Sequence, residues 1–265
     1  MKIRWLFGLS LCMAPAFGVA ARSAFLDGGG ALVGVDIPSL PEVIVAVEGQ
    51  DLHYRVFGDM LVSPEEQKAR AFSGRTWPNG RVVFAFDPAI AQDLRQRFVA
   101  ACHLWMNKTS LTCVERSSES PYVLVKSVPL SGQVAGQSVL GMPRSVGVML
   151  LSDWSQKTLV HEIGHMIGKA HEHQRSDAKT YLDVHLENTD GSDMVKYKLV
   201  PTATRNYMGI DFDSIMFYWT DAFSANGKPT IVLKDQYKQY QNTIGRTDHP
   251  SDADLQDVVD AYKKP

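Results

Sequence analysis

The sequence has no surplus of positive charge. Its 27 lysine and arginine residues face 29 aspartate and glutamate residues, and the formal net charge is −2. Proteins that bind nucleic acid usually gather their cations into a basic patch, and the sequence has no such stripe. We therefore expect no nucleic-acid partner. The chain also has no internal repeat, and its hydrophobic content of 45% is normal for a globular core.

Long apolar runs are scarce, and the clearest one lies at the N-terminus. Lys2 and Arg4 precede the run "WLFGLSLCMAPAFGVA", and small residues follow it. Pro15 interrupts this run, whereas a membrane span needs about 20 uninterrupted apolar residues. The pattern therefore favours a secretory signal peptide over a membrane anchor. We expect residues 1–21 to be removed and the protein to be secreted, with no stable membrane anchor afterwards.

Cysteine is also scarce, with three residues in the whole chain. Cys12 lies in the expected signal peptide, so export leaves Cys102 and Cys113. An even count in an oxidising compartment indicates a disulfide. Two buried thiols are the alternative, and the sequence leaves both open. A bridge across so short a loop would stabilise the fold by a little under about 3 kcal/mol in the chain-entropy model.

Residues 22–70 differ in composition from the remainder of the chain. The stretch "DGGGALVG" is flexible and "SPEEQKARAF" is charged, with Lys68 and Arg70 in the second stretch. Basic residues between two segments are typical sites of proteolytic processing. We expect cleavage near these two residues by an activating protease. An ordinary linker or N-terminal extension is the alternative interpretation.

From Trp77 onward the hydrophobic pattern becomes regular. Apolar spacing predicts amphipathic helices at residues 88–108, 156–168 and 251–264, the last with Ser251 as its cap and Asp254 in capping-box position. Short β-branched and alternating runs predict strands at residues 81–86, 111–115, 122–127 and 146–152. This order of elements favours an α+β fold, with strands packed on two helices and a loop-rich second half.

The most informative stretch is "LVHEIGHMIGKAHEHQRSD", residues 159–177. His161 and His165 are four residues apart, so on a helix both imidazoles project from one face and can share one zinc ion. Glu162, beside the first histidine, can reach a water at the metal. Gly168 can take the positive φ that ends the helix, and His171 can then return as third ligand. A polar helix face without metal is the alternative, and the full H-E-x-x-H-x-x-G-x-x-H spacing argues against it.

This stretch resembles the astacin signature H-E-x-x-H-x-x-G-x-x-H-E-x-x-R-x-D, which it matches through Glu172, Arg175 and Asp177. Downstream, "DFDSIMFY" is similar to the astacin Met-turn S-x-M-x-Y, with Met216 and Tyr218 in the defining positions. The resemblance implies that Met216 forms an apolar floor under the histidines. It also implies that Tyr218 is a displaceable zinc ligand with a catalytic role. Standing alone, the two residues would be a core methionine and a surface phenol.

The resemblance extends to the N-terminal part. An astacin pro-segment carries an F-x-G-D-type motif whose aspartate occupies the zinc, and "YRVFGDM" offers Gly58 and Asp59. The match departs from the motif, because Val56 stands where the phenylalanine is expected and Phe57 is next to it. The resemblance implies Asp59 as a zinc ligand of the latent form only; a turn aspartate is the alternative. It divides the chain into a pro-segment at 22–70 and a protease domain at 71–265.

Two further implications concern the mature enzyme. The resemblance implies that Glu172 pairs with the ammonium of the matured N-terminus; a solvated carboxylate is the alternative. Family members usually have a disulfide from the position of Cys113 to a cysteine near the C-terminus. No cysteine follows Cys113 here, so this bridge is impossible within the chain. The attachment of the last helix is therefore an open question at the level of sequence, and Cys102 is the substitute partner for Cys113.

Together these features predict a secreted zinc endopeptidase made as a latent zymogen. The resemblance implies a metzincin-type fold of two subdomains, with a twisted, mostly parallel sheet and two helices in the N-terminal half and the active-site cleft between the halves. We expect one Zn²⁺ per chain, Glu162 as general base, Tyr218 at the oxyanion, and a protein or peptide substrate extended antiparallel to an edge strand near residues 137–143. A binding protein with structural zinc and a different metalloprotease clan are the alternatives.

Overall fold

The computed structural model describes residues 42–63, 75–130, 133–192, 195, 199 and 209–263. The expected signal peptide and the expected cleavage point near Lys68 and Arg70 lie outside these residues. No helix in the described part of the chain is long and apolar enough to cross a membrane.

An eight-stranded sheet forms the first half of the molecule, with the strand order β1-β2-β3-β7-β8-β6-β4-β5. Its strands are β1 (Glu42–Val47), β2 (Gln50–Phe57), β3 (Met60–Val62), β4 (Arg81–Phe86), β5 (Thr112–Glu115), β6 (Tyr122–Ser127), β7 (Gly136–Val139) and β8 (Val146–Leu151). Among these strands, four neighbouring pairs are parallel and three are antiparallel. The expected α+β fold with a mostly parallel sheet is confirmed.

The three strands β1 to β3 lie within residues 22–70, the segment expected to be a pro-segment. Glu48 and Gly49, at φ 49° and 81°, make the tight turn between β1 and β2. Gly58, at φ 72°, stands at the turn into β3. β3 then pairs in parallel with β7, Met60 opposite Ser138. The sequence pattern does not predict these strands, which extend the sheet beyond β7.

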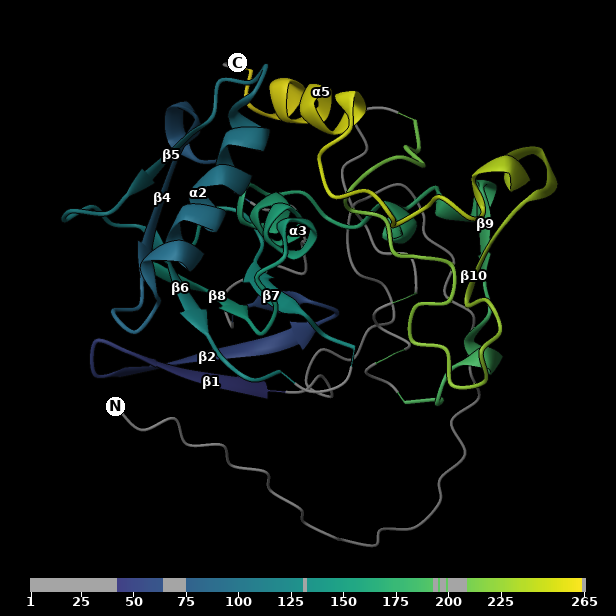
Figure 1. Ribbon diagram of the computed structural model, residues 1–265, viewed down its shortest axis with the longest axis horizontal. Helices are drawn as coiled ribbons and strands as arrows, with labels where there is room; N and C mark the ends of the chain where they lie inside the picture. Colours follow the sequence, from purple (N-terminus) through teal and green to yellow (C-terminus); the bar gives the residue numbers. More distant parts are fainter. Residues whose placement is uncertain are drawn as a thin grey trace, which may run out of the picture.

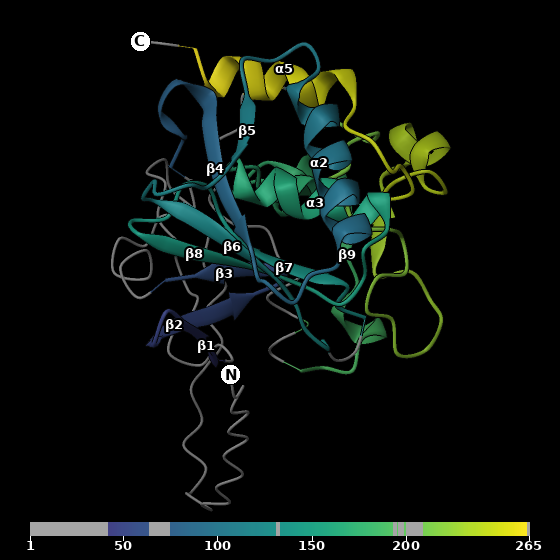
Figure 2. The same cartoon turned by 60° about the vertical axis from the view of Figure 1, so that its left-hand side comes forward.

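Two helices cover one side of the sheet, and the β1–β2 hairpin lies away from them (Figure 1 and, turned by 60°, Figure 2). Helix α2 spans Gln92–Met106 and α3 spans Gln156–Met166. The helix expected from residue 88 begins later, after a turn in which the N–H of Ile90 donates to Asp87 O (3.0 Å). Ile90 is nevertheless buried, so its apolar signal reflects core packing just ahead of the helix.

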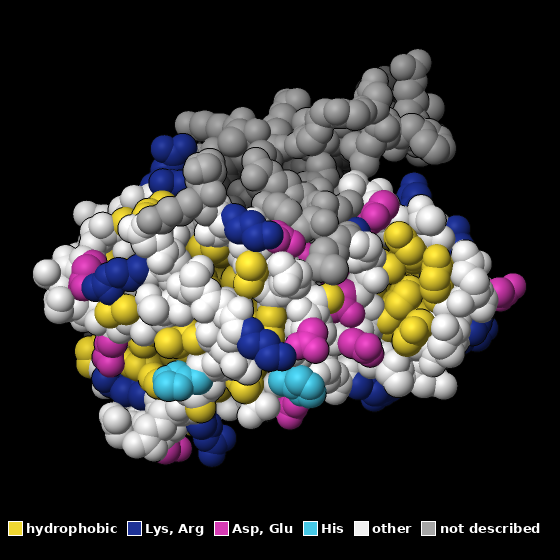
Figure 3. Space-filling model, turned by 90° about the horizontal axis from the view of Figure 1, so that it is seen from above, with side chains coloured by type: hydrophobic (Ala, Val, Ile, Leu, Met, Phe, Trp, Pro, Cys, Tyr) yellow, Lys and Arg dark blue, Asp and Glu magenta, His cyan; other side chains and the backbone are white. Residues whose placement is uncertain are grey.

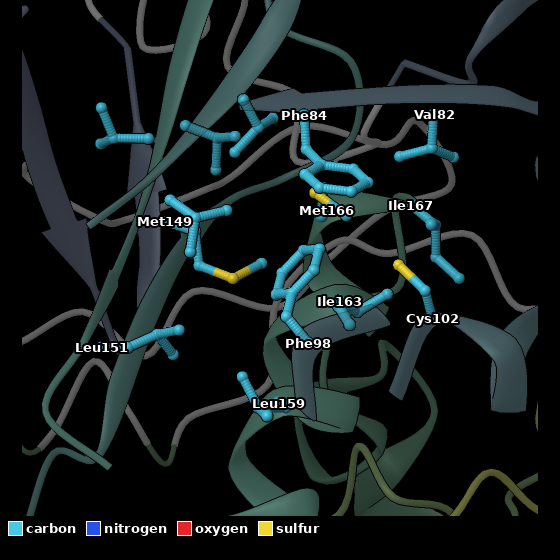
Figure 4. Packing of buried hydrophobic residues seen from close by; sticks show 14 of the residues in the cluster. Val82, Phe84, Phe98, Cys102, Met149, Leu151, Leu159, Ile163, Met166 and Ile167 are labelled. Carbon is cyan, nitrogen blue, oxygen red and sulfur yellow. The ribbon is translucent and has the colours of Figure 1, made fainter. Parts of the chain in front are cut away.

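The core between sheet and helices is formed by apolar side chains at helical and strand spacing (Figure 4). Phe98 of α2 packs against Phe84 of β4, with ring centroids 4.8 Å apart. Ile163 and Met166 present the apolar face of α3 to the same cluster, and both are fully buried. Each such side chain contributes roughly 1.5–3 kcal/mol on burial. This packing fixes the direction of the opposite, histidine-bearing face of α3.

The second half is rich in loops and has its own core. Its only strands among the described residues are β9 (Leu182–Val184) and β10 (Ile231–Leu233), paired antiparallel. Phe212, Phe217 and Tyr218 belong to the apolar cluster of this half, whereas Met216 belongs to the core of the first half. The Met-turn therefore lies where the two halves meet.

The last helix, α5 (Asp252–Ala261), begins with the expected capping box between Ser251 and Asp254. Asp254 also accepts hydrogen bonds from Ser214 Oγ (2.7 Å) and Ile215 N (3.0 Å) in the Met-turn. At the other end of α5, the Tyr262 hydroxyl donates to Ile167 O (2.8 Å). These contacts attach α5 to the active-site region without a disulfide, which answers the question that the missing cysteine raised.

Two further features concern the surface and the cysteines. Cys102 of α2 and Cys113 of β5 form a disulfide, so they join adjacent elements of the first half. On the face shown in Figure 3, basic and acidic side chains are interspersed and do not separate by sign. This distribution agrees with the mixed charges of the sequence.

Candidate metal centre

Helix α3 carries the first two histidines. Ser155 caps the helix by accepting a hydrogen bond from the N–H of Thr158. The Nδ1 of His161 lies 2.8 Å from Ile215 O, and the Nδ1 of His165 lies 2.7 Å from Lys169 O. Because a carbonyl can only accept, each Nδ1 carries the proton and each Nε2 keeps its lone pair. This is the arrangement by which proteins orient metal-binding histidines.

A chain reversal after α3 brings in the third histidine. Gly168 has φ 103°, in the region that favours glycine, and its N–H donates to His165 O (2.8 Å). The N–H of Glu172 donates to Met216 O (3.0 Å), which holds the returning chain against the Met-turn. The Nδ1 of His171 lies 2.6 Å from Gln174 Oε1, so its Nε2 also faces inward. The expected function of Gly168 therefore has a structural basis.

The three Nε2 atoms converge on one point. Nε2 of His171 lies 3.3 Å from that of His161 and 3.2 Å from that of His165. Zinc–nitrogen bonds of about 2.0–2.1 Å in a tetrahedron place ligand nitrogens about 3.3 Å apart. Three lone pairs this close repel one another unless a cation lies between them. The spacing and the chemistry of the donors therefore fit one zinc ion.

Asp59 occupies the fourth position. Its Oδ1 lies 2.9 Å from His171 Nε2 and 3.1 Å from His165 Nε2, and its Oδ2 lies 3.2 Å from His161 Nε2. The ligand atoms of these four residues all lie within 4.8 Å of one another. Burial alone would raise the pKa of Asp59, but the positive charges of His171 and His165 in their protonated forms hold it well below its ordinary value. Burial lowers the pKa of His165 to about 4, which favours the neutral imidazole that a metal needs.

Glu162 lies beside this group and is buried, with 2% of its surface exposed. A Cβ added to Gly136 at the start of β7 would lie 2.6 Å from the Glu162 side chain, so this glycine leaves the space for the carboxylate. Among the described residues, nothing donates a hydrogen bond to Glu162 Oε2. Burial, and then the negative charge of Asp59, raise the pKa of Glu162 well above its ordinary value.

The Met-turn contributes two residues next to this group. Met216 is fully buried, and a Cβ on Gly164 would lie 2.4 Å from its Sδ. Gly164 of α3 therefore makes room for the methionine. The Tyr218 hydroxyl donates to Asp59 Oδ2 at 3.0 Å, so in this form it contacts the aspartate that closes the site.

His173 is buried next to the metal group, although its spacing in the sequence does not match that of the three histidine ligands. Its ring lies 4.3 Å from the ring of Tyr218 and 5.0 Å from that of His171, measured between centroids. It is absent from the group of converging ligand atoms. Its position beside Tyr218 has no signal in the sequence.

Glu172 follows the third histidine and is buried with mixed charges around it. Arg175 lies 3.6 Å from its Oε2, and the N–H of Asp211 donates to the same oxygen (3.2 Å). Burial raises the pKa of Glu172 to about 7, against the positive charges of Lys169 and Arg175. Arg175 is itself held by Asp177 through two hydrogen bonds of 2.9 and 3.0 Å. Sequence reasoning identified Glu172 but missed Lys169 and Asp211.

A cavity of about 240 Å³ opens beside Glu162. It lies between the start of α3, the chain leading into β7, and the segment after Met216, and its lining includes Lys157, Trp219 and Phe223. Asp59 and His161 also line it, so it joins the metal group directly. The expected cleft between the two halves is therefore present at the histidines.

Comparison with known proteins gives relatives of consistent character. The chain is 26% identical over 240 residues to zinc metalloproteinase nas-14 of Caenorhabditis elegans, covering 86% of this chain and 46% of the relative. It is 32% identical to astacin-like metalloprotease toxin 1 of Loxosceles intermedia, covering 64% of this chain and 65% of the relative. The chain thus spans about half to two thirds of the length of these relatives.

The fold also has solved counterparts. High choriolytic enzyme 1, a hatching enzyme zinc-protease from Oryzias latipes, matches with a TM-score of 0.62 at 23% identity, over 72% of this chain and 94% of that one. At this identity the match concerns the fold. Residues 69–263 match the family model of astacin, a family of peptidases. Because that region is well over half of the chain and contains the three converging histidines, the chain belongs to the astacin family.

Proposed function

We propose that the chain is the latent precursor of a secreted zinc endopeptidase. In this proposal residues 1–21 are a signal peptide, residues 22–70 a pro-segment and residues 71–265 the protease domain. The observation that carries it is the convergence of three Nε2 atoms, 3.2–3.3 Å apart where His171 meets the other two, beside a buried glutamate and a cavity. Structural zinc sites usually fill all four positions with permanent ligands, whereas here the fourth ligand comes from the expected pro-segment.

His161, His165 and His171 would hold the zinc, with one ion per chain. When bound there, zinc makes a water molecule acidic enough to act near neutral pH and polarises the substrate carbonyl. Glu162 takes the proton of the attacking water and passes it to the leaving amine. Its burial, and the space that Gly136 leaves for it, support this assignment. The displaced Tyr218 hydroxyl would donate a hydrogen bond to the oxyanion of the tetrahedral intermediate.

The substrate is a protein or peptide that binds extended along β7. We expect it to run antiparallel to this strand, with one side chain next to the cleaved bond entering the cavity beside Glu162. In the described form β3 already lies along β7, and it runs parallel to it. A substrate therefore cannot pair with this edge until β3 leaves.

Latency would follow from two contacts made by the same segment. Asp59 fills the fourth position around the zinc and accepts a hydrogen bond from the Tyr218 hydroxyl (3.0 Å). The backbone supports this placement, because the N–H of Ser138 donates to Asp59 O (2.9 Å). Cleavage near Lys68 or Arg70 by an activating protease would release both contacts. The new N-terminal ammonium would then pair with Glu172, whose buried carboxylate supports such a role.

One experiment tests the proposed activity. Zinc content and cleavage of a quenched fluorescent peptide are measured for the processed chain, for Glu162→Ala and for Glu187→Ala, an exposed glutamate of the second half. We expect one zinc per chain in all three, and a rate lowered by about 10²–10⁴-fold in Glu162→Ala alone. Equal cleavage by Glu162→Ala contradicts the mechanism. Stoichiometric zinc without any cleavage in the processed wild type favours a binding protein with structural zinc.

A further inference from the structure

Lys169 is a cation within the buried turn between the second and third histidines. Its side chain is 10% exposed, and its Nζ lies 3.1 Å from Asp254 Oδ1 and 2.9 Å from Asp257 Oδ2. Both carboxylates belong to α5, at the far end of the sequence. A buried ammonium is costly unless it is paired and hydrogen-bonded, and these two carboxylates satisfy that condition. The established family function leaves this ion pair unused.

The main chain of Lys169 has a second connection, to the metal group. Its carbonyl oxygen accepts the hydrogen bond from His165 Nδ1 (2.7 Å), and its N–H donates to Gly164 O (2.9 Å). The residue that orients His165 through its backbone is therefore the same residue that contacts α5 through its side chain. A displacement of α5 would therefore be transmitted through Lys169 to His165.

Asp254 continues this connection to the other ligand of α3. Its Oδ2 accepts from Ile215 N (3.0 Å), and Ile215 O accepts from His161 Nδ1 (2.8 Å). The contacts thus form a closed ring that runs from His165 through Lys169, Asp254 and Ile215 to His161. The only ion pair in this ring is the one between Lys169 and Asp254. Each remaining link of the ring is a neutral or charge-assisted hydrogen bond.

We propose that Lys169 is a positioning residue of the metal centre, whose charge holds α5 against the two segments that orient His161 and His165. It acts on zinc through the histidines and touches neither the metal nor the substrate. The proposal rests on the assignment of the three histidines as zinc ligands. Residues that orient metal ligands in this way typically change metal affinity about 10–100-fold when they are removed.

The chain offers a matched control for this proposal. Lys126 of β6 and Asp87 form a second buried lysine–aspartate pair, with side chains 5% and 12% exposed. The residues that Lys126 contacts lie in the sheet half and do not contact the three histidines. Lys126→Met should therefore lower stability in the manner of Lys169→Met without acting on the ligands.

The test uses the zinc-loaded full chain and follows the rate of zinc release to a chromophoric chelator, with the thermal midpoint measured in parallel. We expect Lys169→Met to release zinc about 10–100-fold faster than wild type. Lys169→Arg keeps the charge and should restore most of the wild-type rate. Lys126→Met should release zinc at the wild-type rate even though its midpoint falls.

Three results would overturn the inference. Lys169→Met could release zinc at the wild-type rate, Lys126→Met could accelerate release equally, or Lys169→Arg could behave as Lys169→Met does. If Lys169→Met does not fold, Lys169→Gln keeps hydrogen-bond donors without the charge, and unchanged release from it is equally contrary. Failure of the proposed function looks different, because the wild-type chain itself would then bind no stoichiometric zinc, or its processed form would bind zinc without cleaving peptide.

Discussion

The metal group combines two kinds of ligand that differ in how the fold holds them. The three histidines come from one stretch of 11 residues, 161–171, and each Nδ1 has its own oxygen acceptor at 2.6–2.8 Å. Asp59 lies 106 residues from His165 in the sequence and reaches the site from the turn before β3. The histidines belong to the packed core, whereas Asp59 belongs to a segment added at the edge of the sheet.

That added segment is attached through a short strand pairing and through buried side chains such as Val56 and Leu61, which join the core of the first half. β3 pairs with β7 at two residues, Met60 and Leu61. The hairpin before it makes separate polar contacts, since Tyr122 donates to Glu48 Oε1 (3.0 Å) and Tyr54 donates to Val146 O (3.2 Å). Under the proposed function, one group of converging ligand atoms combines three permanent ligands with one removable ligand. The distances between ligand atoms do not distinguish the two kinds, since Asp59 lies 2.9–3.2 Å from the histidine nitrogens and the Nε2 of His171 lies 3.2–3.3 Å from the other two.

Tyr218 contacts Asp59 in the described form and has a catalytic role in the proposed mechanism. Its replacement should therefore change activity more than the replacement of Asp59. In the processed chain, Tyr218→Phe should lower kcat about 100-fold, because a hydrogen-bond donor to the oxyanion is lost. Zinc content should stay at one per chain, since three histidines remain. Steady-state peptide cleavage with parallel metal analysis checks this. A kcat within twofold of wild type would remove Tyr218 from the mechanism.

Removal of the Asp59 carboxylate should weaken latency and leave the three histidines in place. In the uncut precursor, Asp59→Ala should raise peptide cleavage by about 10–100-fold, since the loss of charge-assisted hydrogen bonds of about 1.5–3 kcal/mol lets the segment with β3 leave β7 more often. Asp51→Ala, an exposed aspartate at the start of β2, is the control and should remain latent. Gel analysis confirms that the chain stays uncut during the assay. Unchanged latency in Asp59→Ala would leave Asp59 as a turn residue.

Overpacking at Gly164 should instead destabilise the core around α3, the helix that carries His161 and His165. In Gly164→Ala the new Cβ would lie 2.4 Å from Met216 Sδ and 3.1 Å from the Trp105 ring. Such overpacking lowers the free energy of unfolding by about 1–3 kcal/mol, which urea denaturation measures. Gly209→Ala is the control, because a Cβ there has no neighbour within 4 Å. Equal stability of the two variants would mean that Met216 moves aside without cost.

The smallest effect concerns the pH dependence of stability, to which Asp87 in the sheet half of the molecule contributes. Burial would raise the pKa of Asp87, but the hydrogen bonds from Lys126 and Ala89 and the charges of Lys126 and Arg95 lower it. A carboxylate with a lowered pKa stabilises the fold above its ordinary pKa and loses this contribution as pH falls through the lowered value. Asp87→Asn should therefore be less stable than wild type at pH 7, by about 1–2 kcal/mol.

Denaturation at pH 7 and at pH 3 or below checks the sign of this effect. The difference between wild type and Asp87→Asn should narrow as the wild-type carboxylate becomes protonated. A difference that is constant with pH would mean that the pair contributes no linked protonation.

The ligands were predictable because their geometry is local. The four-residue spacing of His161 and His165 places both on one helix face. Gly168 indicates the end of the helix and the chain reversal that brings His171 back to the site. The capping box at Ser251 is local in the same way, and the structure confirms it. The strands β4, β5, β6 and β8 also followed from apolar runs of the right length.

The rest depends on contacts between distant segments. Asp254 is fully explained by its capping box, so nothing in the sequence indicates its second contact with the Met-turn. Lys169 reads as a surface lysine because its partners are 85 and 88 residues away in the chain. The strands β1 to β3 lie in a segment whose flexible and charged stretches dominate its composition, and β3 has only three residues. Only the pairing with β7 gives them a place in the sheet.

The attachment of α5 has a consequence for the behaviour of the chain under reducing conditions. The only disulfide among the described residues joins α2 to β5, while α5 is held by the buried Lys169–Asp254 pair and by the hydroxyl groups of Ser214 and Tyr262. Thiol reductants act on the first connection and leave the second intact. The ring of contacts around the histidines contains no cysteine, so a reducing medium should loosen the scaffold without opening this ring.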